Sequence, residues 1–253
     1  LAPGARIGPW RIERTVGAGG MGDVYEVARA DGLFQQRAAL KVTQAASAEL
    51  RTRFDTERRI LARLEHPGIA RLLDGGELPD ERPFAVVEFV DGQPITDWCA
   101  ARRLDAAARL RLLVEVCDAV AHAHRHLVVH RDIKPGNVLV DRDGRPRLLD
   151  FGIAKELAVE WGGDVAGGAA TRALATPDYA APEQLAGEPI TTAADVFALG
   201  VLGYELLTGR RPWTVTALPL AHAVRALLDT PPPVPSAVTE AAPDRPVVPR
   251  DLR

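Results

Sequence analysis

Short apolar stretches, separated by glycine and polar residues, make up most of the first ninety residues of the chain. Their residue types and lengths are typical of β-strands, and Asp31-Gly32 marks a turn between two of them. The pattern predicts a meandering antiparallel sheet over residues 6–45, from runs at 10–13, 24–27 and 38–42. Two further strands are expected at 69–73 and 84–89.

Residues 47–65 carry a helical pattern instead, with apolar side chains at spacings of three, four and seven. Glu57 lies on the same stripe as Phe54 and Leu61. A carboxylate on the buried face of a helix is costly to desolvate unless a cation meets it. We therefore expect a cationic partner for Glu57, and Lys41 in the preceding strand is the candidate.

Beyond Gly92 the pattern is mostly helical, with a long amphipathic helix expected at 104–126. Residues 195–207 are apolar on every side, which predicts a helix buried inside a larger lobe, with Asp195 as its cap. A Gly/Ala-rich stretch between residues 152 and 176 is too long for an ordinary connection and is interpreted as a regulatory loop. Seven prolines in 231–253 favour an extended tail. The fold class is α+β, in two lobes.

Composition narrows the function classes. The chain has 253 residues and a net charge of -3, which does not suggest a nucleic-acid or membrane-surface binder, because such proteins usually carry a basic excess. Two cysteines are too few for a disulfide framework, so we expect a reducing, cytoplasmic location. No apolar run approaches the roughly 18 residues of a membrane span, so no membrane contact is expected within these residues. The full-length protein could still be anchored through segments outside them.

A glycine-rich segment follows the first predicted strand. Gly17, Gly19 and Gly22 precede Val24 with the spacing GxGxxGxV, and their bare backbone amides could close over phosphate oxygens. Such clusters between strands are more often plain turns, so the segment alone is a weak signal. No lysine-serine or lysine-threonine pair follows it, and no helix follows to make a dinucleotide fingerprint.

The strongest signal is the run HRDIKPGN at residues 130–137, followed by Asp150-Phe151-Gly152. Phosphoryl transfer needs a carboxylate to accept a hydroxyl proton, a cation near the migrating group and oxygen ligands for Mg²⁺. Asp132, Lys134, Asn137 and Asp150 supply these groups. The chain has only three lysines among 31 basic residues and a single asparagine, and Lys41, Lys134 and Asn137 all fall on these motifs.

The ordered set of glycine loop, Lys41, Glu57, HRDxKxxN, DFG and Ala181-Pro182-Glu183 resembles the eukaryotic-type protein kinases over residues 8–230. The lysine at position 134, two residues after Asp132, resembles the pattern of the serine/threonine branch. The sequences of several segments are similar to those of bacterial members. The resemblance implies a small antiparallel-sheet lobe with one helix and a larger, mainly helical lobe. It implies these divisions: N-lobe 1–87, hinge 88–92, C-lobe 93–230 and Pro-rich tail 231–253.

The resemblance also implies the roles of the site residues, with ATP and Mg²⁺ as cofactors. Lys41 would contact the α- and β-phosphates and be held by Glu57. Asp132 would accept the hydroxyl proton, and Lys134 would steady the γ-phosphate. Asn137 and Asp150 would ligate Mg²⁺. The nucleotide pocket would comprise Val16, Gly17, Gly19, Gly22, Val24, Ala39, Glu88, Val90 and Leu139.

Regulation would act through the loop between the two motifs. Arg131, beside the catalytic aspartate, would accept a phosphate from that loop, and Thr171 is the candidate donor, although a solvated loop residue is the alternative. Thr176 resembles the family's substrate-pocket threonine. Protein substrates with Ser or Thr are implied, and a homodimer for trans-autophosphorylation stays open. Leu61, Leu72, His130 and Phe151 would stack as a spine that links the lobes.

Three alternatives bear on this hypothesis. His122, His124 and His126 suggest a metal site, but only two of them share a helix face and no acidic or Cys partner is in register, so a solvated or packed role is favoured. A pseudokinase-like scaffold would bind nucleotide without efficient transfer, and the two C-terminal helices of the family fold, which we expect to be missing here, would be its defect. A small-molecule phosphotransferase is disfavoured by the complete segment ending at residues 181–183.

Overall fold

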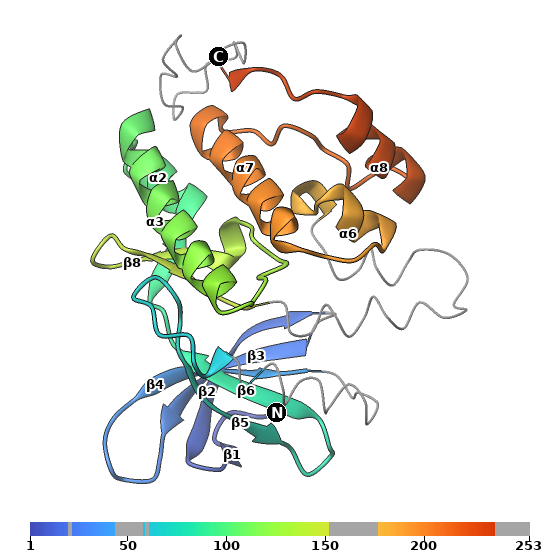
Figure 1. Cartoon of the computed structure of the whole chain (residues 1–253). Coiled ribbons are helices and arrows are strands. Elements are labelled where there is room, and N and C mark those ends of the chain that lie inside the picture. The colour runs from blue at the N-terminus through green and yellow to red at the C-terminus, as the bar shows by residue number, and fades with distance from the viewer. Residues whose placement is uncertain (20–21, 44–57, 59–60, 152–176, 236–253) are drawn as a thin grey trace.

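A six-stranded antiparallel sheet forms one lobe, and helices form most of the other (Figure 1). The computed structural model describes residues 1–19, 22–43, 58, 61–151 and 177–235. The strand order in the large sheet is β1-β2-β3-β4-β6-β5, so every neighbouring pair except β4 and β6 is consecutive in the chain. Its strands are β1 (Arg6–Ile7), β2 (Trp10–Gly19), β3 (Gly22–Arg29), β4 (Arg37–Val42), β5 (Leu72–Glu77) and β6 (Pro83–Glu88).

The two faces of this sheet differ because side chains alternate along each strand. One face carries a buried apolar cluster that contains Tyr25, Leu40 and Val86. The opposite face carries Lys41, which lies between Val24 and Ala85 in the strand register. Residues predicted to contact the nucleotide therefore leave the sheet on the side away from its own apolar cluster.

The expected strand at 69–73 is wrong in its position, since β5 begins at Leu72. Ile69 forms an isolated parallel bridge with Leu148 of the other lobe instead. The backbone N–H of Leu148 donates to the Gly68 carbonyl at 2.7 Å, and that of Ala70 donates to the Leu148 carbonyl at 3.0 Å. These tertiary hydrogen bonds hold the apolar residues 69–70 outside the large sheet. The pattern of apolar residues along the sequence alone could not predict such contacts.

The second lobe combines a small three-stranded sheet with helices (Figure 1). Asp105 caps α3, accepting a hydrogen bond from the Ala108 N–H at 2.7 Å, as expected for an N-cap aspartate. The predicted helix at 104–126 is confirmed as α3. The elements of this lobe are β7 (Gly92–Pro94), α2 (Ile95–Ala101), α3 (Ala106–Arg125), β8 (Val138–Asp141), β9 (Pro146–Leu148), α6 (Pro182–Ala186), α7 (Thr192–Thr208) and α8 (Leu220–Asp229), with 3₁₀ turns at Pro135–Asn137 and Pro177–Tyr179.

The buried helix expected at 195–207 is α7, but its cap is Thr191, whose Oγ1 accepts from the Ala193 N–H at 3.3 Å. The expectation that Asp195 caps this helix is wrong. Asp195 lies inside the first turn of the helix and is 1% exposed. A buried carboxylate needs hydrogen-bond partners, and those of Asp195 come from the segment around residue 130.

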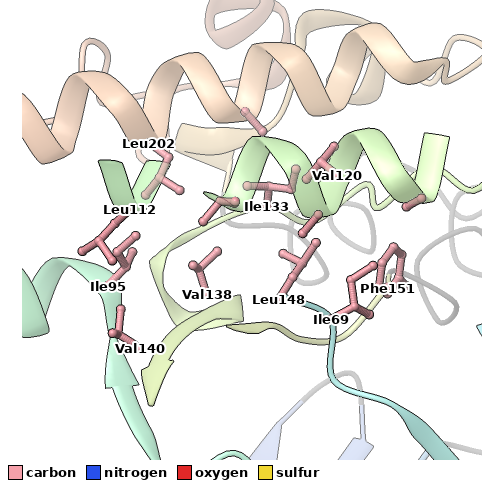
Figure 2. Close-up of a cluster of buried hydrophobic side chains, with 14 of the residues drawn as sticks. Ile69, Ile95, Leu112, Val120, Ile133, Val138, Val140, Leu148, Phe151 and Leu202 are labelled. Atoms are coloured by element: carbon pink, nitrogen blue, oxygen red, sulfur yellow. The ribbon is translucent and has the colours of Figure 1, made fainter. Parts of the chain in front are cut away.

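The core of the helical lobe lies between α3, α7 and the small sheet (Figure 2). Leu112 and Val120 of α3 and Leu202 of α7 belong to this cluster, while Val138 and Leu148 approach from the sheet. Burial of such side chains contributes on the order of 2 kcal/mol each. The same cluster includes Ile133, next to the candidate base, so the core anchors the segment that carries Asp132 directly.

Several expected features lie outside the described residues. These include most of the helix at 47–65, the loop at 152–176 and most of the tail at 231–253. Within the described part of the chain, no helix is both long and apolar enough to cross a membrane.

Candidate active site

Asp132 is the meeting point of two other candidate side chains. Asn137 Nδ2 donates to the Asp132 carbonyl at 2.8 Å and to Asp132 Oδ2 at 3.0 Å. Lys134 Nζ lies 3.0 Å from the same Oδ2 atom. The 3₁₀ turn at Pro135–Asn137 folds the chain back so that these three side chains converge. The structure thus brings together a carboxylate, an ammonium and an amide, as the spacing predicts.

The backbone ahead of Asp132 is held by Asp195 of α7. The N–H groups of His130 and Arg131 donate to the two Asp195 carboxylate oxygens at 2.7 and 2.8 Å. Arg131 has φ 66°, a left-handed conformation that costs about 1–3 kcal/mol for a non-glycine residue. The buried carboxylate therefore stabilises a strained turn that presents Asp132.

His130 forms hydrogen bonds through its ring with the backbone beside both candidate carboxylates. Its side chain is fully buried, and burial lowers the pKa of the imidazole. His130 Nδ1 accepts from the Asp132 N–H at 3.2 Å, so the proton resides on Nε2, which donates to the Leu149 carbonyl at 2.7 Å. Because Leu149 precedes Asp150, this imidazole connects the backbone at both candidate positions.

Asp150 faces the sheet lobe. Its Oδ2 lies 3.3 Å from Lys41 Nζ, which links β4 to the segment after β9. Glu57, the expected partner of Lys41, lies outside the described residues. Asp150 has φ 50°, another left-handed non-glycine residue beside the site. Lys41, the one described lysine of the sheet lobe, thus contacts the carboxylate of Asp150 in the other lobe.

The oxygen donors fit a hard cation. Since Asn137 Nδ2 is used as a donor toward Asp132, its amide Oδ1 is left to act as an acceptor. Asp150 adds a carboxylate. Mg²⁺ prefers oxygen ligands of these two kinds together with phosphate oxygens and water.

The glycine segment forms the end of the β2–β3 hairpin. Gly17 is opposite Val24 in the register, and Gly19 is opposite Gly22. Gly22 has φ 122°, and a Cβ atom there would lie 2.0 Å from the Val42 carbonyl oxygen. Only glycine permits this close approach of β3 to the end of β4.

The expected adenine-contacting residues come from both lobes. Ala39 is opposite Val87 across β4 and β6, on the same strand face as Lys41, and Val16 is about half exposed. Glu88 ends β6, and Val90 lies two residues further along the chain. Leu139 lies on β8 of the other lobe. Val16, Ala39 and Glu88 thus belong to the same sheet as Lys41, and Leu139 lies on the strand that pairs with β9, shortly before Asp150.

Val87 of β6 lines a cavity. Lys41, Asp150 and Phe151 line the same cavity together with other apolar residues from 61–85. Phe151 packs in the same core cluster as Leu61 and Leu72, and its ring centroid lies 4.7 Å from that of His130. The four residues of the predicted spine are therefore brought together.

The regulatory residues are only partly described. The Arg131 carbonyl accepts from Gln184 Nε2 at 2.9 Å, which ties the turn at Asp132 to helix α6. Thr171 and Thr176 lie outside the described residues. The three histidines at the end of α3 serve different contacts: His124 Nε2 lies 2.7 Å from Asp195 Oδ2, and the His122 ring lies between those of His66 and His126.

The sequence alone did not identify Asp178 as a second buried carboxylate. Asp178 is 1% exposed, forms an ion pair with Arg211 and accepts from the Val215 and Thr216 N–H groups at 2.6 and 2.9 Å. The Tyr179 hydroxyl donates to Glu205, and burial raises the pKa of both side chains. These contacts hold the segment before α6 on the helical lobe. In the sequence, the nearby Ala181-Pro182-Glu183 motif indicates that this region matters, but it does not indicate which residues Asp178 and Tyr179 contact.

Comparison with known proteins identifies the arrangement. A family model described as "Protein kinase domain" matches residues 10–235. The serine/threonine-protein kinase Pkn1 of Myxococcus xanthus is 39% identical over 248 residues, covering 94% of this chain and 34% of that protein. The serine/threonine-protein kinase PknA of Mycobacterium tuberculosis is 36% identical over 237 residues, covering 90% of this chain and 53% of that protein. The chain thus spans between a third and about half of the length of these curated relatives.

A solved structure has the same architecture. The crystal structure of the Mycobacterium tuberculosis PknI kinase domain matches with a TM-score of 0.66 and 31% sequence identity, covering 97% of this chain and 94% of that chain. The match confirms the α+β bilobal fold expected from the sequence. Both curated relatives are bacterial serine/threonine kinases, as the resemblance implied.

Proposed function

The chain belongs to the protein kinase domain family, and we propose that it transfers the γ-phosphoryl group of ATP to Ser and Thr hydroxyls of proteins. The observation that carries this proposal is the geometry around Asp132 and Asp150. One carboxylate contacts Lys134 and Asn137, while the other meets Lys41 from the opposite lobe at 3.3 Å. These are the groups that phosphoryl transfer requires, and they come from both lobes.

In the proposed reaction, Asp132 accepts the proton of the substrate hydroxyl while the hydroxyl oxygen bonds to the γ-phosphorus. The bond from that phosphorus to the β–γ bridging oxygen breaks at the same time, and ADP leaves. Lys134, 3.0 Å from Asp132, neutralises charge on the migrating phosphoryl group. Lys41 positions the α- and β-phosphates. Asn137 and Asp150 would hold Mg²⁺, which supplies charge neutralisation on the phosphate oxygens when bound.

The surroundings of the site support positioning as the main source of catalysis. His130 forms hydrogen bonds with the backbone at Asp132 and at Leu149, and Asp195 holds the strained turn at Arg131. Donors and acceptors fixed before the substrate arrives need little reorganisation during the reaction. The glycine hairpin at 17–22 would cover the phosphates with backbone N–H groups.

The proposal is tested by incubating the chain with ATP labelled at the γ-phosphate, with Mg²⁺ and a general protein acceptor. We expect label on the acceptor and on the chain itself, located on Ser or Thr by mass spectrometry. Chelation of Mg²⁺ should abolish the incorporation. Nucleotide binding without any transfer under these conditions would contradict the proposal and favour a scaffold.

The loop threonine gives a second test. We predict that Thr171→Ala slows the rise of activity during preincubation with Mg-ATP, because a phosphate at this position would form charge-assisted hydrogen bonds with Arg131. Such bonds contribute about 1.5–3 kcal/mol, so the loss of activation should be on the order of tenfold or more. Activity is measured after timed preincubation. Thr171→Ser, which keeps a phosphorylatable hydroxyl, is the control; equal activation of all three proteins would exclude Thr171 as the switch.

We also propose the wider context of this activity. The substrates are proteins with accessible Ser or Thr, and two copies of the chain act on each other in trans. The lobes divide at a hinge over residues 88–92, between an N-lobe at 1–87 and a C-lobe at 93–230. We place the domain in the cytoplasm, where ATP and Mg²⁺ are available.

A further inference from the structure

Three segments that are distant in sequence meet at the side chain of Glu88, the last residue of β6. Glu88 Oε2 lies 2.6 Å from Arg147 Nη2 on β9, and the N–H of Arg71 approaches the same oxygen at 3.4 Å. The Glu88 N–H donates to the Arg71 carbonyl at 2.8 Å. Glu88 therefore connects the end of the sheet lobe to the small sheet of the helical lobe.

Arg147 belongs to the part of β9 that holds residues 68–70. Its Nη2 approaches the Ile69 carbonyl at 3.4 Å, beside the two backbone hydrogen bonds between Leu148 and the 68–70 segment. The Arg147 side chain is 16% exposed and that of Glu88 is 36% exposed. Solvent screens this ion pair less than it screens a fully exposed one.

The strand register connects this ion pair to the expected nucleotide pocket. Leu139 is directly opposite Arg147 across β8 and β9, so the two side chains leave the same face of the small sheet. Leu139 and Glu88 are both among the residues expected to form the nucleotide pocket. The pair thus joins the two lobes beside this expected pocket.

We propose that the Glu88–Arg147 ion pair is a positioning pair that holds the hinge in its nucleotide-accepting geometry before nucleotide binds. The inference rests on the proposed function. A hinge that is already ordered loses less conformational freedom on binding than a loose one. Arg147 acts through Glu88 and the hinge backbone and contacts no reacting atom.

The chain supplies a matched control in a second ion-pair group at the hinge. Asp91 Oδ2 lies 2.7 Å from Arg142 Nη2 and 3.7 Å from Arg37 Nη1. It also joins the two lobes, but the Arg142 side chain is 82% exposed. Exposed pairs of this kind contribute little because solvent screens them. Removal of the Arg142 charge should therefore leave the hinge unchanged.

The test is the dissociation constant of Mg-ADP, measured by titration calorimetry for Arg147→Gln, Glu88→Gln and the double variant. Each single variant should bind about three- to tenfold more weakly, since ordering one side chain on binding costs about 0.5–1.5 kcal/mol. The double variant should be no weaker than the weaker single variant. Arg147→Lys should recover part of the loss, and Arg142→Gln should bind like the parent. Turnover at saturating ATP should change less than the affinity.

Hydrogen exchange of the free protein gives an independent readout. Residues 68–71 and 88–92 should exchange faster in Arg147→Gln than in the parent and in Arg142→Gln, at an unchanged melting temperature. Unchanged Mg-ADP affinity, additive losses in the double variant or faster turnover with unchanged affinity would each overturn the inference. If the parent transfers no phosphate but Arg147→Gln still weakens Mg-ADP binding, the proposed function fails and the positioning pair stands.

Discussion

Replacing Asp132 by Asn should lower phosphoryl transfer on the order of 10²- to 10⁴-fold while leaving Mg-ADP affinity within about twofold. Asn has nearly the same shape, so it can keep contacts with Asn137 and Lys134. Its amide cannot accept the proton of the substrate hydroxyl at neutral pH. The initial rate of labelled phosphate incorporation into a protein acceptor is the measurement, beside calorimetric titration with Mg-ADP.

Asp143→Asn is the matched control for this prediction. Asp143 is exposed in the turn between β8 and β9, a few residues from the site in sequence, and its substitution removes the same charge. We expect it to transfer phosphate at the parental rate. Comparable rates in the parent and in Asp132→Asn would show that Asp132 is not the base, even if nucleotide still binds.

The second large effect is expected at Asp195. Asp195→Ala leaves the N–H groups of His130 and Arg131 without their acceptor inside the protein, and it removes the contact with His124. An unsatisfied buried donor costs about 1–3 kcal/mol, so the free energy of unfolding should fall on the order of 3 kcal/mol. The left-handed turn at Arg131 loses its support at the same time. Denaturant unfolding and the transfer rate should therefore fall together.

Asp229→Ala separates this effect from the general loss of a helix carboxylate. Asp229 ends α8 and forms an exposed ion pair with Arg225 at 3.1 Å, a contact typically worth less than about 1 kcal/mol. Its unfolding free energy should remain close to that of the parent. If Asp195→Ala were as stable and as active as Asp229→Ala, the assigned role of the buried carboxylate would be wrong.

Local signals predicted much of this molecule. Short apolar runs identified β2, β3, β4 and β6, the helical period identified α3, and the uniformly apolar run identified α7. Asp132, Lys134 and Asn137 lie within six residues of one another, so one turn brings them together and the motif alone indicates their chemistry. Asp150 was predicted from its motif and its distance in sequence from the run at 130–137. Its contact with Lys41 arises because the two residues lie on facing parts of the two lobes.

Contacts between distant residues were not predictable from pattern. Asp195 was expected to cap a helix because it precedes an apolar run, yet its acceptor role depends on backbone groups more than sixty residues away. A carboxylate in an otherwise apolar helix does signal a buried partner, but not which one. The same holds for Glu88 with Arg147 and for Asp178 with Arg211. Residues 69–70 lie outside the large sheet because Gly68 and Ala70 form backbone hydrogen bonds with Leu148 of the other lobe.

The most direct measurement is a crystal structure of the chain with Mg²⁺ and a non-hydrolysable ATP analogue. We expect Lys41 Nζ within hydrogen-bond distance of the α- or β-phosphate, and Mg²⁺ bound by Asp150 and by Asn137 Oδ1. Asp132 should face the open space beyond the γ-phosphate, with Lys134 beside that group. A nucleotide bound elsewhere, or phosphates that none of these four side chains approaches, would contradict the account of this site as a phosphoryl-transfer centre.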